Sequence, residues 1–188
     1  MNIYFIRHGY AYHNQLAEEI GDIAYFDKKT EDSPLLEKGI DQAKYASKEL
    51  MNIDFDYVFC SPSLRCIQTL ENLTSNKNVQ LFDILMEPQG EHFCNKRKNI
   101  NELAHFCSEL SNNYNINYVN QKYNFEKETY QNFIERTKEF YKYLVNLKNI
   151  NSKNILIVSH HDWIKVFFKY NLDIDYYPKN CEIRKIIL

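Results

Sequence analysis

Near the start of the 188-residue chain stands the stretch Ile3-Tyr4-Phe5-Ile6-Arg7-His8-Gly9, from which the rest of the sequence can be interpreted. Residues 3–6 are apolar or aromatic, which predicts a short buried strand. An arginine and a histidine follow where this strand ends. Ligands of α/β sheets bind beyond the carboxyl ends of the strands. The sequence therefore places Arg7 and His8 where a ligand site is expected.

Two later strands end in similar polar groups. The apolar run 57–60 is followed by Ser61-Pro62-Ser63-Leu64-Arg65, and the run 154–159 is followed by His160-His161-Asp162. Two arginines and at least one histidine thus converge on one edge of the predicted sheet. Such a group has the charge and the hydrogen-bond donors to hold a phosphate dianion. One histidine can attack phosphorus while the other side chains neutralise charge on the oxygens.

Strands and helices alternate along the chain. The spacing of apolar residues predicts helices over 36–50, 64–73, 101–110, 130–145 and 163–169, and further strands over 79–82 and 183–187. Segments 10–33 and 86–99 are predicted to be loops, and 111–127 a loop or a lid. This order favours a single domain, residues 1–188, folded as a three-layer α/β/α sandwich with a mixed, mostly parallel sheet.

The composition is that of an ordinary globular protein, with 44% hydrophobic and 26% charged residues and a net charge of -2. It gives no general preference for nucleic acid or for an anionic membrane, so any anion site has to be local. The 23 basic residues are mostly lysine. Arg7 and Arg65 therefore stand out, because arginine is the residue suited to bidentate recognition of phosphate.

The cysteines and the amino-terminal residues predict a cytoplasmic protein. The chain has five cysteines, an odd number, without a C-x-x-C pair. This argues against a disulfide framework or a zinc site and favours reduced thiols. The first residues lack the pattern of a signal peptide, and no apolar run approaches the ~20 residues that span a bilayer.

Five motifs resemble, in the same order, those of the histidine phosphatase superfamily, the phosphoglycerate-mutase-like proteins. They cover roughly residues 1–90 and 150–188. They are Arg7-His8-Gly9; Asn14, five residues after that glycine; Leu35-Leu36-Glu37-Lys38-Gly39-Ile40-Asp41-Gln42-Ala43; Ser61-Pro62-Ser63-Leu64-Arg65-Cys66-Ile67-Gln68-Thr69; and Val158-Ser159-His160.

The resemblance implies a role for each matched residue. His8 is expected to be the nucleophile that accepts the phosphoryl group as phosphohistidine. It has to attack as a neutral imidazole, with its other ring nitrogen hydrogen-bonded. Arg7, Arg65 and His160 are expected to hold the phosphoryl oxygens, with help from Asn14. No metal ion and no cofactor are expected, because the positive side chains supply what a metal would.

A general acid has to protonate the leaving alcohol. In this family an acidic residue after the third strand does so, and residues 85–90 resemble that region, although Gly90 comes one place early. Glu87 is the candidate, and Glu91 in the same loop is the second. A bound phosphate dianion raises the pKa of such a carboxyl group and keeps it protonated. The alternative is that Glu87 is a solvated loop residue.

Several residues depart from the family pattern or suit other sites. His161 replaces the usual small residue after the second histidine, and Tyr10-Ala11 replace an acidic-small pair. A metal site on residues 160–162 is disfavoured, because adjacent residues rarely all face one ion. A cysteine-phosphatase site needs five residues between its cysteine and arginine, whereas four separate Cys60 from Arg65. Cys60 is therefore expected to be a buried strand residue.

Two segments outside these motifs have alternative interpretations. Lys96-Arg97-Lys98 is by default a solvated run of charge, but it is also a candidate second contact for a polyphosphorylated or acidic substrate. The aromatic residues of 111–130 either line a lid or pack on the core.

Three functions fit the motifs. The first is a metal-independent phosphatase that hydrolyses a small-molecule or protein phosphomonoester. The second is a phosphoglycerate mutase, which usually carries longer insertions around its site. The third is a pseudoenzyme that binds phosphorylated ligands, which predicts a missing nucleophile or clamp residue. The short chain disfavours a mutase, and the presence of Arg7, His8, Arg65 and His160 disfavours a pseudoenzyme, so hydrolysis is favoured. Specificity is expected to lie in segments 10–33, 86–99 and 111–127.

Overall fold

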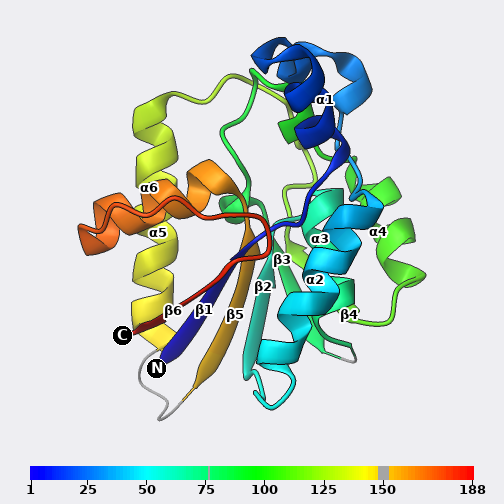
Figure 1. The fold of residues 1–188 in the computed structure, drawn as a ribbon. Coiled ribbons are helices and arrows are strands. Elements are labelled where there is room, and N and C mark those ends of the chain that lie inside the picture. Colours follow the sequence, from blue (N-terminus) through cyan, green and yellow to red (C-terminus); the bar gives the residue numbers. More distant parts are fainter. Residues whose placement is uncertain (76, 148–152) are drawn as a thin grey trace.

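Six strands form one sheet in the computed structural model, which describes residues 1–75, 77–147 and 153–188 (Figure 1). The strands are ordered β4-β3-β2-β5-β1-β6, and every neighbouring pair is parallel except β1 with β6. The mixed, mostly parallel sheet is thereby confirmed. The strand bounds are β1 Asn2–Arg7, β2 Tyr57–Cys60, β3 Asn78–Phe82, β4 Asn113–Tyr118, β5 Asn154–Ser159 and β6 Ile183–Ile187.

Helices cover both faces of this sheet (Figure 1). Successive side chains of a strand point to opposite faces, and the central strands therefore contribute to two separate apolar clusters. Ile6 and Val58 pack with residues of α2 (Glu37–Leu50), α3 (Leu64–Leu73) and α4 (Ile100–Ser108). Phe5 and Phe59 pack with residues of α5 (Tyr130–Asn146) and α6 (His161–Leu172). The predicted three layers are confirmed.

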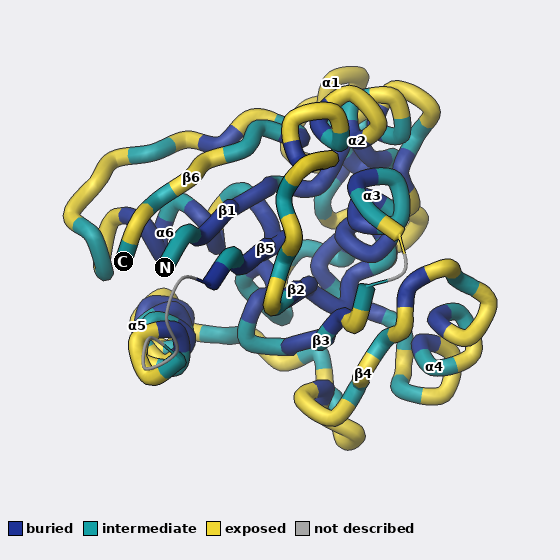
Figure 2. The backbone as a smooth tube through the Cα atoms, turned by 90° about the horizontal axis from the view of Figure 1, so that it is seen from below, coloured by how far each residue is buried: buried dark blue, intermediate teal, exposed yellow. Residues whose placement is uncertain are grey.

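The register of the central strands brings their carboxyl ends together. Arg7 at the end of β1 pairs with Ser159 at the end of β5. Cys60 at the end of β2 pairs with Val158 of β5. These strands are buried along most of their length (Figure 2). Cys60 is fully buried, as predicted. The residues that follow the three strands therefore meet at one edge of the sheet.

Segment 10–33 is not the predicted loop. It contains the helix α1 (Tyr12–Ile20) and two short 3-10 helices, at Asp22–Phe26 and Lys28–Thr30. Helix α1 has apolar residues at helical spacing, Tyr12, Leu16 and Ile20, but it buries only one of its residues, His13. It lies above the carboxyl ends of the strands (Figure 1).

Segment 111–127 is also more regular than predicted, because it contains the edge strand β4. Its sequence, Asn-Tyr-Asn-Ile-Asn-Tyr, alternates between polar and apolar residues, and Tyr114 and Ile116 pack on the core. Tyr118 stacks on Phe82, with ring centroids 4.1 Å apart. Tyr114 therefore packs on the core, whereas Tyr118 stacks on Phe82 with 49% of its own surface exposed.

Candidate active site

Arg7 and His8, at the end of β1, line a cavity of about 320 Å³. The cavity brings together five of the six predicted site residues, and the sixth, His160, lies beside His8 with ring centroids 5.3 Å apart. The lining consists of Arg7, His8, His13, Asn14, Tyr25, Arg65, Glu87, His92, Cys94, Asn95, His161 and Asp162.

His8 is buried and has a defined hydrogen-bond partner. Its Nδ1 atom lies 2.8 Å from the carbonyl oxygen of Gly9. Because a carbonyl only accepts, Nδ1 carries the proton and Nε2 keeps its lone pair. Burial, followed by the charge of Arg65, lowers the pKa of His8 well below 6.5. The imidazole is therefore neutral, with one nitrogen available as a nucleophile.

Hydrogen bonds from residues of the later motifs hold the His8 loop in place. The backbone N–H of Gly9 donates to Thr69 Oγ1 at 2.9 Å, and that of Tyr10 donates to Gln42 Oε1 at 2.9 Å. The backbones also approach closely here, because a Cβ atom built on Gly9 would lie 2.6 Å from the carbonyl oxygen of Gly39. The glycine, glutamine and threonine of the motifs thus fix where His8 sits.

The two arginines each keep an unpaired N–H group. Arg65 is buried, and its Nη1 donates to the carbonyl of Cys94 at 2.6 Å and its Nη2 to Asn95 Oδ1 at 3.2 Å. Arg7 donates through Nη1 to the carbonyl of Pro178 at 3.2 Å. Nε of both side chains is buried without a partner in the described part of the chain. No carboxylate among the described residues forms an ion pair with either guanidinium, so both charges are available to an anion.

His160 is fully buried and is bonded away from the cavity. Its Nε2 lies 2.8 Å from Ser61 Oγ and 3.5 Å from Cys66 Sγ. Burial and the charge of Arg65 lower the pKa of His160 well below 6.5, so this imidazole is neutral. His160 does not line the cavity, and its contact with a phosphoryl group stays a prediction.

Glu87 is buried at the amino terminus of α6. Its Oε1 accepts the backbone N–H of Asp162 at 3.0 Å, and its Oε2 accepts that of Trp163 at 2.9 Å. Burial and the negative charge of Asp162 raise the pKa of Glu87 to about 7. The alternative of a solvated loop residue is wrong. Glu91, by contrast, is exposed, lies outside the cavity lining and is 3.5 Å from Lys127 Nζ.

Asn14 faces the cavity with its amide group partly engaged. Its Oδ1 accepts the backbone N–H of Ala11 at 3.0 Å, at the start of α1. The oxygen is therefore used by the protein, and the amide N–H groups remain as donors for a ligand.

Among the cavity residues that the sequence did not predict are three with rings: His13, Tyr25 and His92. They form a row of rings, in which His13 and Tyr25 have centroids 6.2 Å apart and Tyr25 and His92 5.2 Å apart. All three lie in segments predicted as loops, where no periodic pattern shows which side chains are buried. The signal nearest to His13 is the motif residue Asn14, which directly follows it in the sequence.

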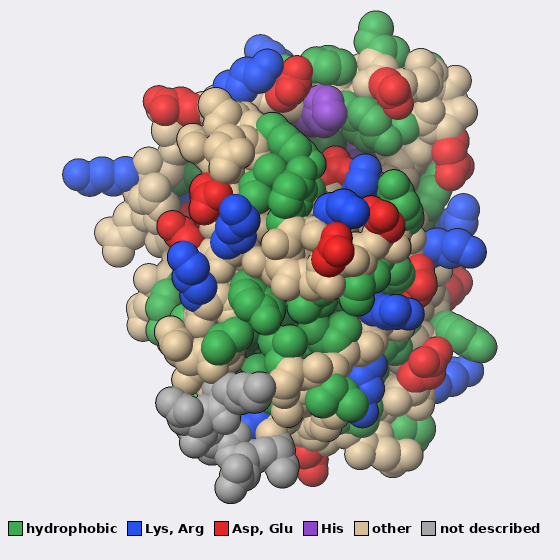
Figure 3. All heavy atoms as spheres, turned by 90° about the vertical axis from the view of Figure 1, so that its left-hand side faces the viewer, with side chains coloured by type: hydrophobic (Ala, Val, Ile, Leu, Met, Phe, Trp, Pro, Cys, Tyr) green, Lys and Arg blue, Asp and Glu red, His purple; other side chains and the backbone are tan. Residues whose placement is uncertain are grey.

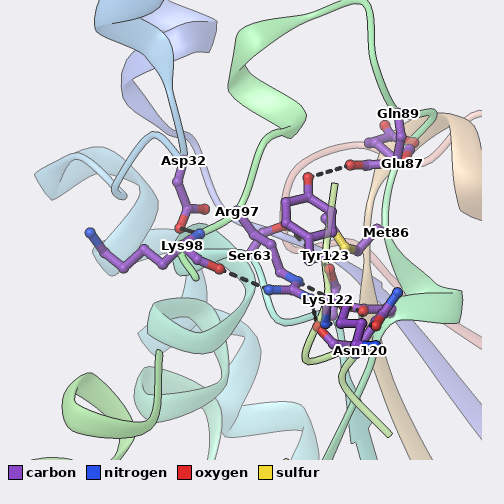
Figure 4. Close-up of polar contacts among 12 residues, drawn as sticks. Asp32, Ser63, Met86, Glu87, Gln89, Arg97, Lys98, Asn120, Lys122 and Tyr123 are labelled. Carbon is purple, nitrogen blue, oxygen red and sulfur yellow. Dashed lines mark hydrogen bonds and ion pairs between the residues drawn. The ribbon is translucent and has the colours of Figure 1, made fainter. Parts of the chain in front are cut away.

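Arg97 is neither a solvated charge nor an anion contact (Figure 4). Its side chain is buried, and Nε and Nη2 donate to the two carboxylate oxygens of Asp83 at 2.8 and 2.9 Å. The guanidinium also lies over the ring of Tyr123, 4.0 Å from its centroid, and Tyr123 donates to Gln89 Oε1 at 2.7 Å. The default prediction for Lys96-Arg97-Lys98 is thus wrong for its central residue.

His161 and Asp162 form the rim of the cavity. His161 Nδ1 lies 2.9 Å from Asp162 Oδ1, whereas His160 turns inward to Ser61. Among the residues that the structure describes, no group of three or more histidine, cysteine or acidic side chains is arranged to hold a metal ion.

On the face formed by α5 and α6, acidic and basic side chains are interspersed (Figure 3). Within the described ranges, no helix combines the length and the apolar character needed to cross a bilayer.

A family model described as "Histidine phosphatase superfamily (branch 1)" matches residues 3–182. A search of curated protein sequences gave no match. Solved structures with the same fold include the phosphoserine phosphatase of Entamoeba histolytica in complex with 3-phosphoglyceric acid, which is 23% identical with a TM-score of 0.63 over 99% of this chain and 90% of that chain.

Two further structures share the fold at lower identity. The ecdysone phosphate phosphatase of Bombix mori is 16% identical, with a TM-score of 0.69 over 98% of this chain and 88% of that chain. YhfR of Bacillus stearothermophilus is 19% identical, with a TM-score of 0.66 over 100% of this chain and 91% of that chain.

Proposed function

Because the chain belongs to the histidine phosphatase superfamily, we propose that it hydrolyses phosphomonoesters through a phosphohistidine intermediate on His8. The observation that carries this proposal is a neutral, buried imidazole with a free Nε2 beside two guanidinium groups that no carboxylate pairs among the described residues. A nucleophile and two cations in a small cavity suit a dianionic phosphoryl group.

In the first step, His8 Nε2 attacks phosphorus and the bond to the ester oxygen breaks. The oxygen leaves as an alcohol after taking a proton from the carboxyl group of Glu87. Arg7 and Arg65 stabilise the charge on the phosphoryl oxygens, and Asn14 donates through its amide. This positive charge supplies the stabilisation that a metal ion supplies in other phosphatases.

In the second step, water attacks the phosphohistidine. The Glu87 carboxylate accepts the proton of that water, the bond from phosphorus to Nε2 breaks, and inorganic phosphate leaves. His8 returns to its neutral state and Glu87 to its protonated state. The pKa of Glu87, raised to about 7, supports this exchange. A group whose pKa is close to the working pH can both donate and accept a proton.

Hydrolysis is preferred to the two alternatives. A mutase has to keep water from the phosphohistidine, and the short chain offers little material for such a cage. A pseudoenzyme is disfavoured because Arg7, His8, Arg65 and His160 are all present. The substrate is a small-molecule or protein phosphomonoester. A cytoplasmic location is supported by the five cysteines, all of which are buried free thiols.

The test is hydrolysis of an aryl phosphate in EDTA by the wild type, His8→Ala and the matched control His105→Ala, which changes an exposed histidine. We expect activity in the wild type and the control only. A phosphoprotein that is labile to acid and stable to alkali should accumulate on rapid quench. Activity that survives in His8→Ala, or that EDTA abolishes, would contradict the mechanism. Conversion of 3-phosphoglycerate to its 2-isomer would instead indicate a mutase.

A further inference from the structure

His13 occupies an unusual position for a histidine. It is the buried residue of α1, with 5% of its surface exposed, and it lines the cavity that contains His8. The ring centroids of His13 and His8 lie 5.5 Å apart. The other side of the His13 ring faces Tyr25, at 6.2 Å. The ring of His13 therefore packs directly against the ring of the proposed nucleophile.

The ring of His13 has no hydrogen-bond partner among the residues that the structure describes. Nδ1 is buried and unpaired, and no described residue bonds to Nε2. Buried polar groups are nearly always paired, and an unpaired one costs free energy. His8 and His160, the two other buried histidines of the site, are each bonded to a protein oxygen. The exception at His13 indicates that its partner is a ligand.

The charges around His13 indicate which ligand. Burial, followed by the positive charges of Arg65 and Arg7, lowers the pKa of His13 well below 6.5. The ring is therefore neutral and keeps one N–H donor. Neither of its nitrogens is committed to the protein, so a ligand is free to select the tautomer. Beside two guanidinium groups, the expected ligand for this donor is an anionic oxygen.

We propose that His13 donates a hydrogen bond from a ring N–H to an oxygen of the phosphoryl group held between His8, Arg7 and Arg65. His13 is thus a third imidazole of the phosphate site, which binds the phosphoryl group without adding charge. This inference rests on the proposed function, because it assumes that the cavity holds a phosphoryl group.

The experiment compares His13→Phe and His13→Gln with the wild type, and uses His105→Phe as the matched control. Orthovanadate serves as the phosphate analogue. Three quantities are measured: kcat/KM with an aryl phosphate, inhibition by vanadate, and the rise in Tm that vanadate causes. We expect His13→Phe to lose about 10- to 100-fold in kcat/KM and in vanadate affinity, the usual effect of one hydrogen bond to a charged group. His13→Gln, which keeps a donor, should retain more of both.

The Tm of the ligand-free protein separates binding from packing. Phenylalanine fills the same space without unpaired nitrogens, so ligand-free His13→Phe should unfold at the same or a higher temperature than the wild type. A lower Tm together with equal losses in His13→Phe and His13→Gln would assign His13 a packing role and overturn the proposal. Wild-type values in His13→Phe would overturn it as well, and leave the proposed function intact. A wild type that neither hydrolyses the ester nor binds vanadate would overturn the proposed function itself.

Discussion

The Oε1 atom of Glu87 accepts the backbone N–H of Asp162 at 3.0 Å, which fixes the carboxyl group at the amino terminus of helix α6, beside the cavity. The same neighbour raises the pKa of Glu87 through its negative charge, after the larger effect of burial. A pKa raised to about 7 suits the proposed role of Glu87 as the group that protonates the leaving oxygen.

Replacement of Glu87 with glutamine should therefore act on the leaving group. Glutamine retains the shape and one of the two acceptor oxygens, but it has no acidic proton to transfer. We expect kcat for alkyl phosphates to fall about 10²- to 10⁴-fold, the usual contribution of general acid catalysis. Aryl phosphates, which need less help to leave, should lose far less. Steady-state kinetics with the two ester types checks this, and an equal loss with both would assign Glu87 another role. Glu91→Gln is the control and should behave as the wild type.

The pH dependence of the reaction should have its alkaline limit at Glu87. The first step needs the protonated acid, so kcat/KM for alkyl phosphates should fall as pH rises through about 7. The acidic limit should lie well below 6.5, because the pKa of His8 is depressed and the nucleophile remains neutral there. A pH profile from 5 to 9 measures both limits, and the alkaline limit should disappear in Glu87→Gln. An alkaline limit that persists in this variant would assign it to another group.

Acid should destabilise the fold through its buried histidines. The pKa of His13 in the folded chain lies well below its ordinary value of 6.5. As pH falls below 6.5, the unfolded chain therefore takes up a proton at this residue that the folded chain does not. The stability is fully present above 6.5 and is lost as pH falls toward the depressed pKa.

Urea unfolding at a series of pH values tests this linkage. Each such histidine contributes a slope of at most about 1.4 kcal/mol per pH unit below 6.5. Substitution of His13 by phenylalanine removes one titrating group, so the stability of this variant should fall less steeply with acid. His105→Phe changes an exposed histidine and should follow the wild-type curve. Parallel curves for His13→Phe and the wild type would show that His13 is not buried in its neutral form.

Arg97 and Asp83 form a bidentate ion pair that connects the end of β3 with the loop after Glu87. Removal of one partner from a buried pair leaves the other charge uncompensated. We expect Arg97→Leu to lower the free energy of unfolding by about 3 kcal/mol. Lysine cannot form both bonds, so Arg97→Lys should also destabilise. The neighbouring Lys96→Ala, which breaks a partly exposed pair with Glu31, should cost at most about 1 kcal/mol. Equal urea midpoints for Arg97→Leu and Lys96→Ala would contradict this assignment.

The sequence predicts best what is local. Arg7 ends the buried strand β1, His8 follows it, and Arg65 comes five residues after the end of β2; parallel strands bring such positions to one edge. Glu87 was harder to place, because its burial depends on backbone N–H groups of α6, 75 residues later in the chain. The first turn of α6 was missed for a related reason: His161 and Asp162 carry no apolar signal, although their backbone is helical.

The residues that escaped prediction owe their position to tertiary contacts. His13 is buried because α1 folds over the strand ends, and as a polar residue it is not singled out by the hydrophobic spacing of that helix. Arg97 lies in a run of three basic residues, which usually marks a solvated surface, but Asp83 draws it inward. Strand β4 alternates correctly, yet asparagine is uncommon in strands and obscured the pattern.

Thr69 connects two of the motifs through one hydroxyl group. Its Oγ1 accepts the backbone N–H of Gly9 at 2.9 Å and donates to the carbonyl of Arg65 at 2.6 Å. The loop that carries His8 is thereby joined to the helix that carries Arg65. Thr69→Val keeps the shape but leaves the buried N–H of Gly9 without an acceptor.

We expect Thr69→Val to lose about 1–3 kcal/mol of stability, the cost of one unsatisfied buried donor. It should also lose at least tenfold in kcat/KM, because His8 shifts relative to the arginines and a small misplacement of reacting groups is costly. Thr69→Ser retains the hydroxyl and should stay close to the wild type in activity, with only a modest loss of stability from the missing methyl group. Urea unfolding and aryl phosphate kinetics, measured on both variants, distinguish the two roles of this side chain. If Thr69→Ser is as impaired as Thr69→Val, the methyl group rather than the hydroxyl positions His8, and the proposed connection between the motifs is wrong.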